Sequence, residues 1–536
     1  MSAGTTSIEQ QAEGADCEEK RAGSDKPVGL VRATSVVMTA TIVSAGFGLV
    51  REMLVAQRFG ATAQTDAYFF AFDLIVGLPE FLLGGMVGAL IPIYTHCKRS
   101  GQDTPYDFAS TIINVYLVYL LIAVVVLSIG APLLSSTLAG GLDDASRELV
   151  TRFIWMLAPT VLLAGIWMIM KAMLEADGHF LVSQISTGFV AVGIIVAVLL
   201  LVPSIGIYSL PVGVLGGVTV RTVWVAFWLR KSGFKYRWTM NTGLPEFRRY
   251  LALLGPGIAA GVIAGMIPIM DKSMASHLPA GTIATLSFAG RPMGLVTRFG
   301  LYALVTAMLP TLAWQAMQQD RAEFRGSISQ ILGMLIFVTT PLALILAALR
   351  VPIIQVLFQR GDFDAEATVR TASIFGVLIL GLMPLTVATT LSTVFKAMED
   401  TKTVAVLGGG GNLVSKILFN FAFIVPFGVL GLAMASALQH VVSGLLLLES
   451  LRRRLNGIGI RSLSITCVKV VPASLLACMA VHATVVYWHL PPLLLCMFGF
   501  VIGSTLFIIL AAALRTKELS MLFQYVLSRL QASDSK

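Results

Sequence analysis

Four charged residues stand inside two long apolar segments, and their spacing is the same in both. The stretch "FDLIVGLPEF" (72–81) carries Asp73 and Glu80, seven residues apart, in an otherwise apolar run. A second apolar run carries Arg291 and Arg298, also seven residues apart. Seven residues make nearly two turns of an α-helix, about 10 Å of rise, so each pair lies on one stripe of its helix. Carboxylates and guanidinium groups placed in this way can bind one another, an ion or a charged substrate.

The surrounding sequence is that of a membrane protein. Of its 536 residues, 56% are hydrophobic and 12% are charged, whereas about a quarter of the residues in a soluble domain are charged. Apolar stretches long enough to cross a bilayer as a helix, about 20 residues, recur along the chain. A β-barrel would show short alternating segments instead. The sequence therefore predicts an all-α polytopic membrane protein.

The apolar stretches predict about fourteen transmembrane helices, and the charges between them predict their orientation. Lys and Arg cluster in the connections that follow even-numbered spans, which places both termini in the cytoplasm by the positive-inside rule. The first 28 residues are polar and show no removable signal peptide. The expected spans are 30–57, 65–94, 107–136, 147–174, 180–203, 207–230, 247–275, 282–311, 325–348, 368–396, 402–425, 428–451, 465–488 and 492–514.

The chain repeats itself. The tripeptide "KAM" occurs at 171–173 and at 396–398, an offset of 225, and "FA" occurs at 70–71 and at 288–289, an offset of 218. Two proline pairs fit the same offsets: Pro159 with Pro384, and Pro92 with Pro310. We therefore expect two six-helix lobes related by a pseudo-twofold axis along the membrane normal, a common plan of transporters. The expected divisions are a cytoplasmic tail (1–28), an N-lobe (29–232), a C-lobe (246–455), a two-helix extension (464–515) and a second cytoplasmic tail (516–536).

The offset of 218 also relates Asp73 to Arg291 and Glu80 to Arg298. Each charge would cost roughly 2.5–3.5 kcal/mol in lipid, so these side chains must face water, a substrate or one another. Two interpretations stay open. The pairs can be permanent salt bridges between the lobes, or they can form and break while the arginines hold an anionic substrate, for which the planar guanidinium is suited. We expect the pairs to bridge in at least one state.

Further ionisable residues gather in the same spans. Arg51 and Glu52 lie within the first span, and Asp66 opens the second. Asp271 and Lys272 lie near the end of the seventh span and are also candidate cavity charges. Because charges at helix ends often snorkel to the interface, snorkelling is the favoured interpretation for Arg58 and Lys272.

Signatures of enzymes do not occur in the sequence. It contains no P-loop, HExxH or GxSxG motif, no cluster of histidines and no paired cysteines. We therefore expect a transporter with no catalytic residue, no metal site and no cofactor, driven by an ion gradient, the membrane potential or the gradient of its substrate. The net charge of +9 is explained by basic connections between spans, so we expect no nucleic-acid partner.

Several segments resemble the MurJ/MviN lipid II flippases, a family of the multidrug and oligosaccharidyl-lipid exporter superfamily. The resemblance lies in "SAGFGLVRE" (44–52), "FGATAQTDAYFFAF" (59–72), "MDK" (270–272), "LFQRGDFDAEAT" (357–368) and "FKAMEDTKT" (395–403). It implies fourteen spans, a cationic cavity between two lobes, and an extension that forms a groove for the lipid tail.

The resemblance also implies a function. The protein would move a polyprenyl-pyrophosphate-linked saccharide, the peptidoglycan precursor lipid II, outward across the bacterial cytoplasmic membrane by alternating access. Membrane potential is the implied drive, and the implied partners are the lipid substrate, membrane lipids and the cell-wall synthesis machinery. Carried over position by position, Arg51 matches a family arginine, Glu52 and Asp66 match family acids, and Arg291 matches a cavity arginine.

The chain departs from the family pattern at four places. A family arginine is replaced by Ala45, and a basic pair by Pro79-Glu80. A family glutamate is replaced by Gly294, and Arg298 is an added charge. A flippase for another lipid-linked oligosaccharide, such as an exopolysaccharide repeat unit, therefore stays open as an alternative. An ion-coupled exporter of small amphipathic cations is disfavoured, because Arg51, Arg291 and Arg298 would repel its cargo. A non-transporting membrane scaffold is a third alternative, but it would not need charges at positions that the repeat relates.

Overall fold

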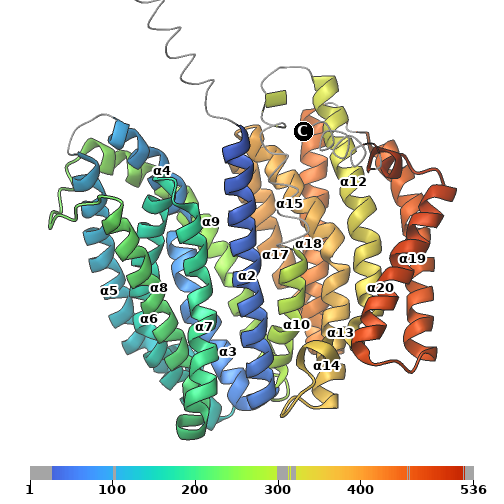
Figure 1. Ribbon diagram of the computed structural model, residues 1–536, viewed down its shortest axis with the longest axis horizontal. Coiled ribbons are helices and arrows are strands. Elements are labelled where there is room, and N and C mark those ends of the chain that lie inside the picture. Colours follow the sequence, from blue (N-terminus) through green and yellow to red (C-terminus); the bar gives the residue numbers. More distant parts are fainter. Residues whose placement is uncertain are drawn as a thin grey trace, which may run out of the picture.

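Helices make up the ordered elements of this chain in the computed structural model, which describes residues 27–99, 104–297, 312, 314–315, 321–455, 457, 459–522 and 524 (Figure 1). The helices before residue 232 are α2 (Pro27–Phe59), α3 (Ala63–Val76), α4 (Leu78–Arg99), α5 (Thr104–Leu138), α6 (Asp144–Ala176), α7 (Phe180–Ile205), the short η1 (Gly206–Tyr208) and α8 (Ser209–Lys231).

The later helices follow in the same way along the chain. They are α9 (Pro245–Ala275), α10 (Thr282–Val296), α12 (Arg321–Ala348), α13 (Arg350–Phe358), α14 (Ala365–Leu380), α15 (Leu382–Ala397), α16 (Thr401–Thr403), the π-helical turn η3 (Val404–Gly410), α17 (Gly411–Phe427), α18 (Val429–Arg454), α19 (Ile460–Tyr487) and α20 (Pro492–Ala513).

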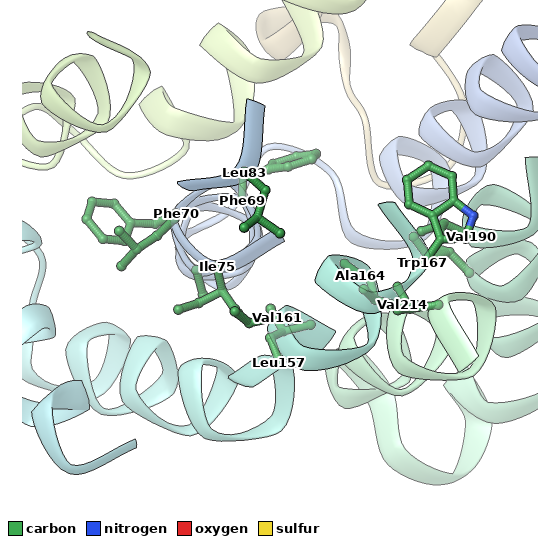
Figure 2. Close-up of a cluster of buried hydrophobic side chains, with 14 of the residues drawn as sticks. Phe69, Phe70, Ile75, Leu83, Leu157, Val161, Ala164, Trp167, Val190 and Val214 are labelled. Atoms are coloured by element: carbon green, nitrogen blue, oxygen red, sulfur yellow. The ribbon is translucent and has the colours of Figure 1, made fainter. Parts of the chain in front are cut away.

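Two groups of helices stand side by side (Figure 1). In the first group, α6 packs against α3, α4, α5 and α8, and α7 packs against α2 and α8. Its core consists of apolar side chains such as Ile75, Leu157 and Val161, with Trp167 beside Val190 and Val214 (Figure 2). In the second group, α10 packs against α14, α14 and α15 pack against α18, and α17 packs along α18.

Helix α9 belongs to the second half of the sequence but packs along α4 of the first group. It also contacts α5, and it reaches α17 and α18 of the second group. Helix α9 therefore connects the two groups. Helices α19 and α20 pack on α12 and α13 at one edge of the molecule, shown in red in Figure 1.

The all-α membrane fold predicted from the sequence is confirmed. Within the described ranges, nine helices are long and apolar enough to cross a membrane, or ten if α14 and α15, bent by 41° at their junction, form one span. The total of fourteen spans stays a prediction, because α4, α9 and α10 include or adjoin residues outside the description.

The expected second span, 65–94, is broken rather than continuous. Helix α3 ends at Val76 and α4 begins at Leu78, with Gly77 between them. Pro79 has no N–H to continue the hydrogen bonding, and its ring clashes with the preceding turn, which explains the break. Asp73 and Glu80 therefore lie on two successive helices rather than on the one continuous helix that the sequence predicts.

Candidate functional site

Two arginines from different helices meet at one glutamate between the helix groups. Glu52 on α2 is buried, with a relative exposure of 2%. Its Oε1 forms an ion pair with the neighbouring Arg51 and lies 3.1 Å from Nε of Arg291 on α10. Nε of Arg291 has no aligned hydrogen-bond acceptor, so the contact between α2 and α10 is ionic.

A second ion pair joins α9 to α3. Nζ of Lys272 on α9 lies 2.5 Å from Oδ2 of Asp73 on α3, and it donates a hydrogen bond of 2.7 Å to the carbonyl oxygen of Phe69. The lysine side chain is 7% exposed, so its interpretation as a snorkelling residue is wrong. Its acid partner, Asp73, is about 200 residues away in the sequence, so the position of Lys272 near a helix end does not indicate that the lysine is paired.

The sequence predicts two ion pairs between the lobes, Asp73 with Arg291 and Glu80 with Arg298. In this conformation Asp73 pairs with Lys272, and Arg291 pairs with Glu52. A bridge between Asp73 and Arg291 in another conformation stays a prediction. Glu80 is exposed, and Arg298 lies outside the described residues.

The carboxylate of Asp66 on α3 caps the N-terminus of α10, a helix of the other group. Its Oδ2 accepts a hydrogen bond of 2.6 Å from the amide of Gly281, and its Oδ1 accepts one of 2.6 Å from the amide of Ala284. Gly281 is the residue just before α10, and Ala284 lies in its first turn, where N–H groups have no partner within the helix. Asp66, on α3, therefore caps α10 from outside its own helix.

Backbone contacts close this end of the molecule, which we call the closed end (57–66, 281–284 and 358–363). The amide of Asp362 donates a hydrogen bond of 3.0 Å to the carbonyl oxygen of Gln57. Gly60 and Gly361 both have φ of +57°. A Cβ at Gly60 would collide with the backbone of Asp362, and a Cβ at Gly361 would collide with the backbone of Gln57 at the end of α2. These two glycines allow the loops to meet without a gap.

An aromatic cluster fills the space next to the closed end. The ring centroid of Phe288 on α10 lies 5.1 Å from that of Phe69 on α3, with the rings nearly perpendicular. The rings of Phe358 and Phe363 lie 5.2 Å and 5.4 Å from Phe288. Helices of both groups thus meet at this end through apolar side chains that exclude water.

Asp271 faces away from Lys272, its neighbour in the sequence. Its Oδ2 lies 3.1 Å from Nζ of Lys416 on α17, and its Oδ1 accepts a hydrogen bond of 2.8 Å from Asn420. The side chain of Lys416 is fully buried, and its ammonium also donates to the carbonyl oxygen of Leu432 on α18. One turn of α9 therefore carries an ion pair to each helix group.

Sequence reasoning missed Lys416 and Arg221. Both stand within apolar runs, in "NLVSKILFNF" and in "GVTVRTVW", so the argument applied to the four opening charges would have found them. The offsets of 218 and 225 relate neither residue to another charged residue, so the repeat does not single them out.

The central charges suit the binding of an anion. Arg51, Arg291 and Lys272 face two carboxylates, Glu52 and Asp73, so one positive charge is in excess. The side chain of Arg291 is 32% exposed and that of Asp73 is 29% exposed, so these pairs can be reached from solvent. An arginine that shares its acid with another arginine can turn its donors to an incoming oxyanion.

Two helix groups that meet at a closed end and through partly exposed ion pairs are the architecture of one class of protein, the polytopic membrane transporters. A structure titled "Lipid II flippase MurJ, inward closed conformation" superposes with a TM-score of 0.77 at 23% identity, covering 89% of this chain and 98% of that one. An inward-facing multidrug resistance MATE family transporter of the MOP superfamily superposes with a TM-score of 0.66 at 14% identity, covering 78% and 98%.

The family follows from the sequence comparison. The family model "Lipid II flippase MurJ" matches residues 55–525, and this chain belongs to that family. A relative from Synechocystis, "Probable lipid II flippase MurJ", is 28% identical over 486 residues, which are 86% of this chain and 88% of the relative. The resemblance expected from the short segments is thus confirmed over most of the chain.

Proposed function

We propose that the protein moves lipid II, a polyprenyl-pyrophosphate-linked saccharide, across the cytoplasmic membrane by alternating access. Its membership of the lipid II flippase family supports the substrate. The observation that carries the mechanism is the shared carboxylate of Glu52, which holds Arg51 and Arg291 between the two helix groups with one cation in excess.

The central arginines receive the anionic head group of the lipid. A diphosphate entering between the groups competes with Glu52 for the guanidinium of Arg291, since paired N–H donors fit phosphate oxygens well. Separation of Arg291 from Glu52 removes one ionic contact between α2 and α10. The groups then rock, the closed end opens, and the lipid tail stays in the bilayer.

The closed end faces the outside of the cell in this proposal. The basic connections after even-numbered spans support an orientation with both termini in the cytoplasm. In that orientation the structure corresponds to a state closed to the outside. Membrane potential or a coupling ion drives the cycle, without a cofactor and without a catalytic residue.

Complementation tests the proposal. The essential lipid II flippase of a host bacterium is depleted, this protein is expressed, and survival and externally exposed lipid II are measured. We expect rescue by the wild type and loss of rescue with Arg291→Ala. The matched control is Arg152→Ala, an arginine whose side chain is 49% exposed and pairs with Glu148 on its own helix.

Two results would contradict the proposal in different ways. Normal insertion without rescue by the wild type would point to another lipid-linked oligosaccharide, the alternative that Ala45 and Pro79-Glu80 leave open. Full rescue by Arg291→Ala would show that the arginine shared with Glu52 does not bind the head group.

A further inference from the structure

One arginine inside the first helix group lacks an acid partner. Within the described spans, the cations discussed above pair with carboxylates: Arg51 and Arg291 with Glu52, Lys272 with Asp73, and Lys416 with Asp271. Arg221, in the middle of α8, forms no ion pair with a described carboxylate, and its Nε is buried without a hydrogen-bond acceptor. A charge at this depth is costly without a partner.

The position of Arg221 on α8 shows that it does not face lipid. Val220, Val223 and Phe227 are 53%, 62% and 61% exposed and mark the outer stripe of the helix. Successive residues of an α-helix are turned by about 100°, so Arg221 points about 200° away from Val223. Its guanidinium lies over the ring of Trp167 on α6, 4.1 Å from the ring centroid.

The indole of Trp167 is fixed in place under the guanidinium. Its Nε1 donates a hydrogen bond of 3.0 Å to Ser186 on α7, and the side chain is buried. The stacked arrangement covers one face of the guanidinium and leaves its N–H edge free. Lys171, one turn along α6, places its ammonium 5.3 Å from the centroid of the same ring.

Two more donors without acceptors lie on the same stripe of α8. Nε1 of Trp224 and Nε1 of Trp228 are buried and have no hydrogen-bond partner among the described atoms. Residues 221, 224 and 228 follow the spacing that aligns side chains along a helix. The ammonium of Lys171 is paired with Glu175 at 3.5 Å, but these N–H donors have no acceptor. Because buried polar groups normally have partners, a guanidinium with an indole N–H one turn away calls for an acceptor that carries negative charge.

The geometry points to a second oxyanion subsite, formed by Arg221 on its Trp167 platform with the indole N–H group of Trp224, one turn along α8. Resting on the proposed function, it holds an anionic group of the lipid-linked saccharide, a phosphate of the diphosphate or a carboxylate of the head group.

Binding to the purified full-length protein tests the subsite. The probes are lipid II, undecaprenyl diphosphate, which has no saccharide, and undecaprenol, which has no anion. We expect the wild type to bind the first two and Arg221→Gln to weaken binding by about 10- to 100-fold, the range of a hydrogen bond to a charged group. Arg152→Gln, on the surface of the same helix group, should bind like the wild type.

A second variant keeps the test informative if Arg221→Gln does not fold. Trp224→Phe removes one unpaired N–H and keeps an aromatic ring. We expect weaker lipid binding together with an unchanged or raised thermal midpoint, because the variant loses a buried donor that has no acceptor in the empty protein. A purely structural tryptophan would instead lower the midpoint and leave affinity unchanged.

The outcomes separate the two proposals. Weakened binding of both anionic lipids by Arg221→Gln supports a phosphate contact, and weakened binding of lipid II alone supports a carboxylate contact. Equal affinities of Arg221→Gln and the wild type would overturn the subsite and leave Arg221 a hydrated charge. If the wild type binds neither anionic lipid, the result contradicts the proposed function and therefore also the subsite, which rests on it.

Discussion

At the scale of single residues, the most demanding feature is a fully buried lysine. The ammonium of Lys416 is satisfied by the carboxylate of Asp271, the carbonyl oxygen of Leu432 and the hydroxyl of Ser436. These acceptors come from α9 and α18, whereas the lysine comes from α17. Removal of one partner from such a pair leaves an uncompensated charge in a site that water does not reach.

We therefore expect Lys416→Met to destabilise the protein by about 3–5 kcal/mol. The free energy of unfolding, measured by denaturant titration in detergent, checks this value. Lys416→Met combined with Asp271→Asn should recover most of the loss, because both charges are then absent. The control Lys98→Met breaks an ion pair whose lysine is 48% exposed and should cost no more than about 1 kcal/mol. Equal costs for both single variants would contradict the prediction.

The sequence indicates which charges lie inside apolar segments, but it does not indicate their partners. Asp73, Arg291, Glu52 and Arg51 were selected because charges are costly in apolar segments, and that argument needs no structure. The partner of Asp73 is Lys272 rather than Arg291, because equivalent positions in a repeat need not be in contact. Pairing depends on how α9 lies between the two groups, which local sequence does not encode.

At the scale of elements, the sequence predicts the ends of a membrane-spanning helix well where an apolar run is bounded by polar connections. Helices α7 and α18 begin and end close to their expected limits. The break between α3 and α4 was missed because hydropathy continues across Gly77 and Pro79. A proline at the second position of the second helix is the signal that indicates the break.

Close packing of α20 gives a prediction at this scale. A Cβ at Gly503 would lie 2.7 Å from Val481 and 2.9 Å from Ile345, so α20 approaches α19 and α12 closely here. Gly503→Leu should destabilise the protein by about 1–3 kcal/mol through overpacking, seen as a lower thermal midpoint. Gly130→Leu is the matched control, since a Cβ at Gly130 meets nothing within 4 Å. An equal drop in both variants would refute the packing argument.

At the scale of the whole molecule, alternating access requires the closed end to open. The backbone contact between Gln57 and Asp362, 3.0 Å from oxygen to nitrogen, brings these residues within reach of a disulfide. With the five native cysteines replaced, the pair Gln57→Cys and Asp362→Cys should cross-link under oxidation. We expect the cross-link to abolish lipid movement in a vesicle assay and a reductant to restore it.

The single cysteine variants serve as controls and should be insensitive to the oxidant. Undiminished lipid movement by the fully cross-linked protein would contradict the expectation that this end opens in the transport cycle. The assay reports on the motion of the helix groups and does not depend on which arginine binds the head group.

The carboxylate of Asp66 gives the closed end a further property. Because the first amides of α10 are held by a residue of α3, parting the two helices strips α10 of its cap, at a cost of about 0.5–2 kcal/mol. Opening of the closed end is thus in part a local unfolding reaction. The amide protons of Gly281 and Ala284 should therefore exchange with deuterium faster in the open state than in the closed one. Each half of the transporter completes the secondary structure of the other, so hydrogen exchange at two backbone positions can time the transport cycle.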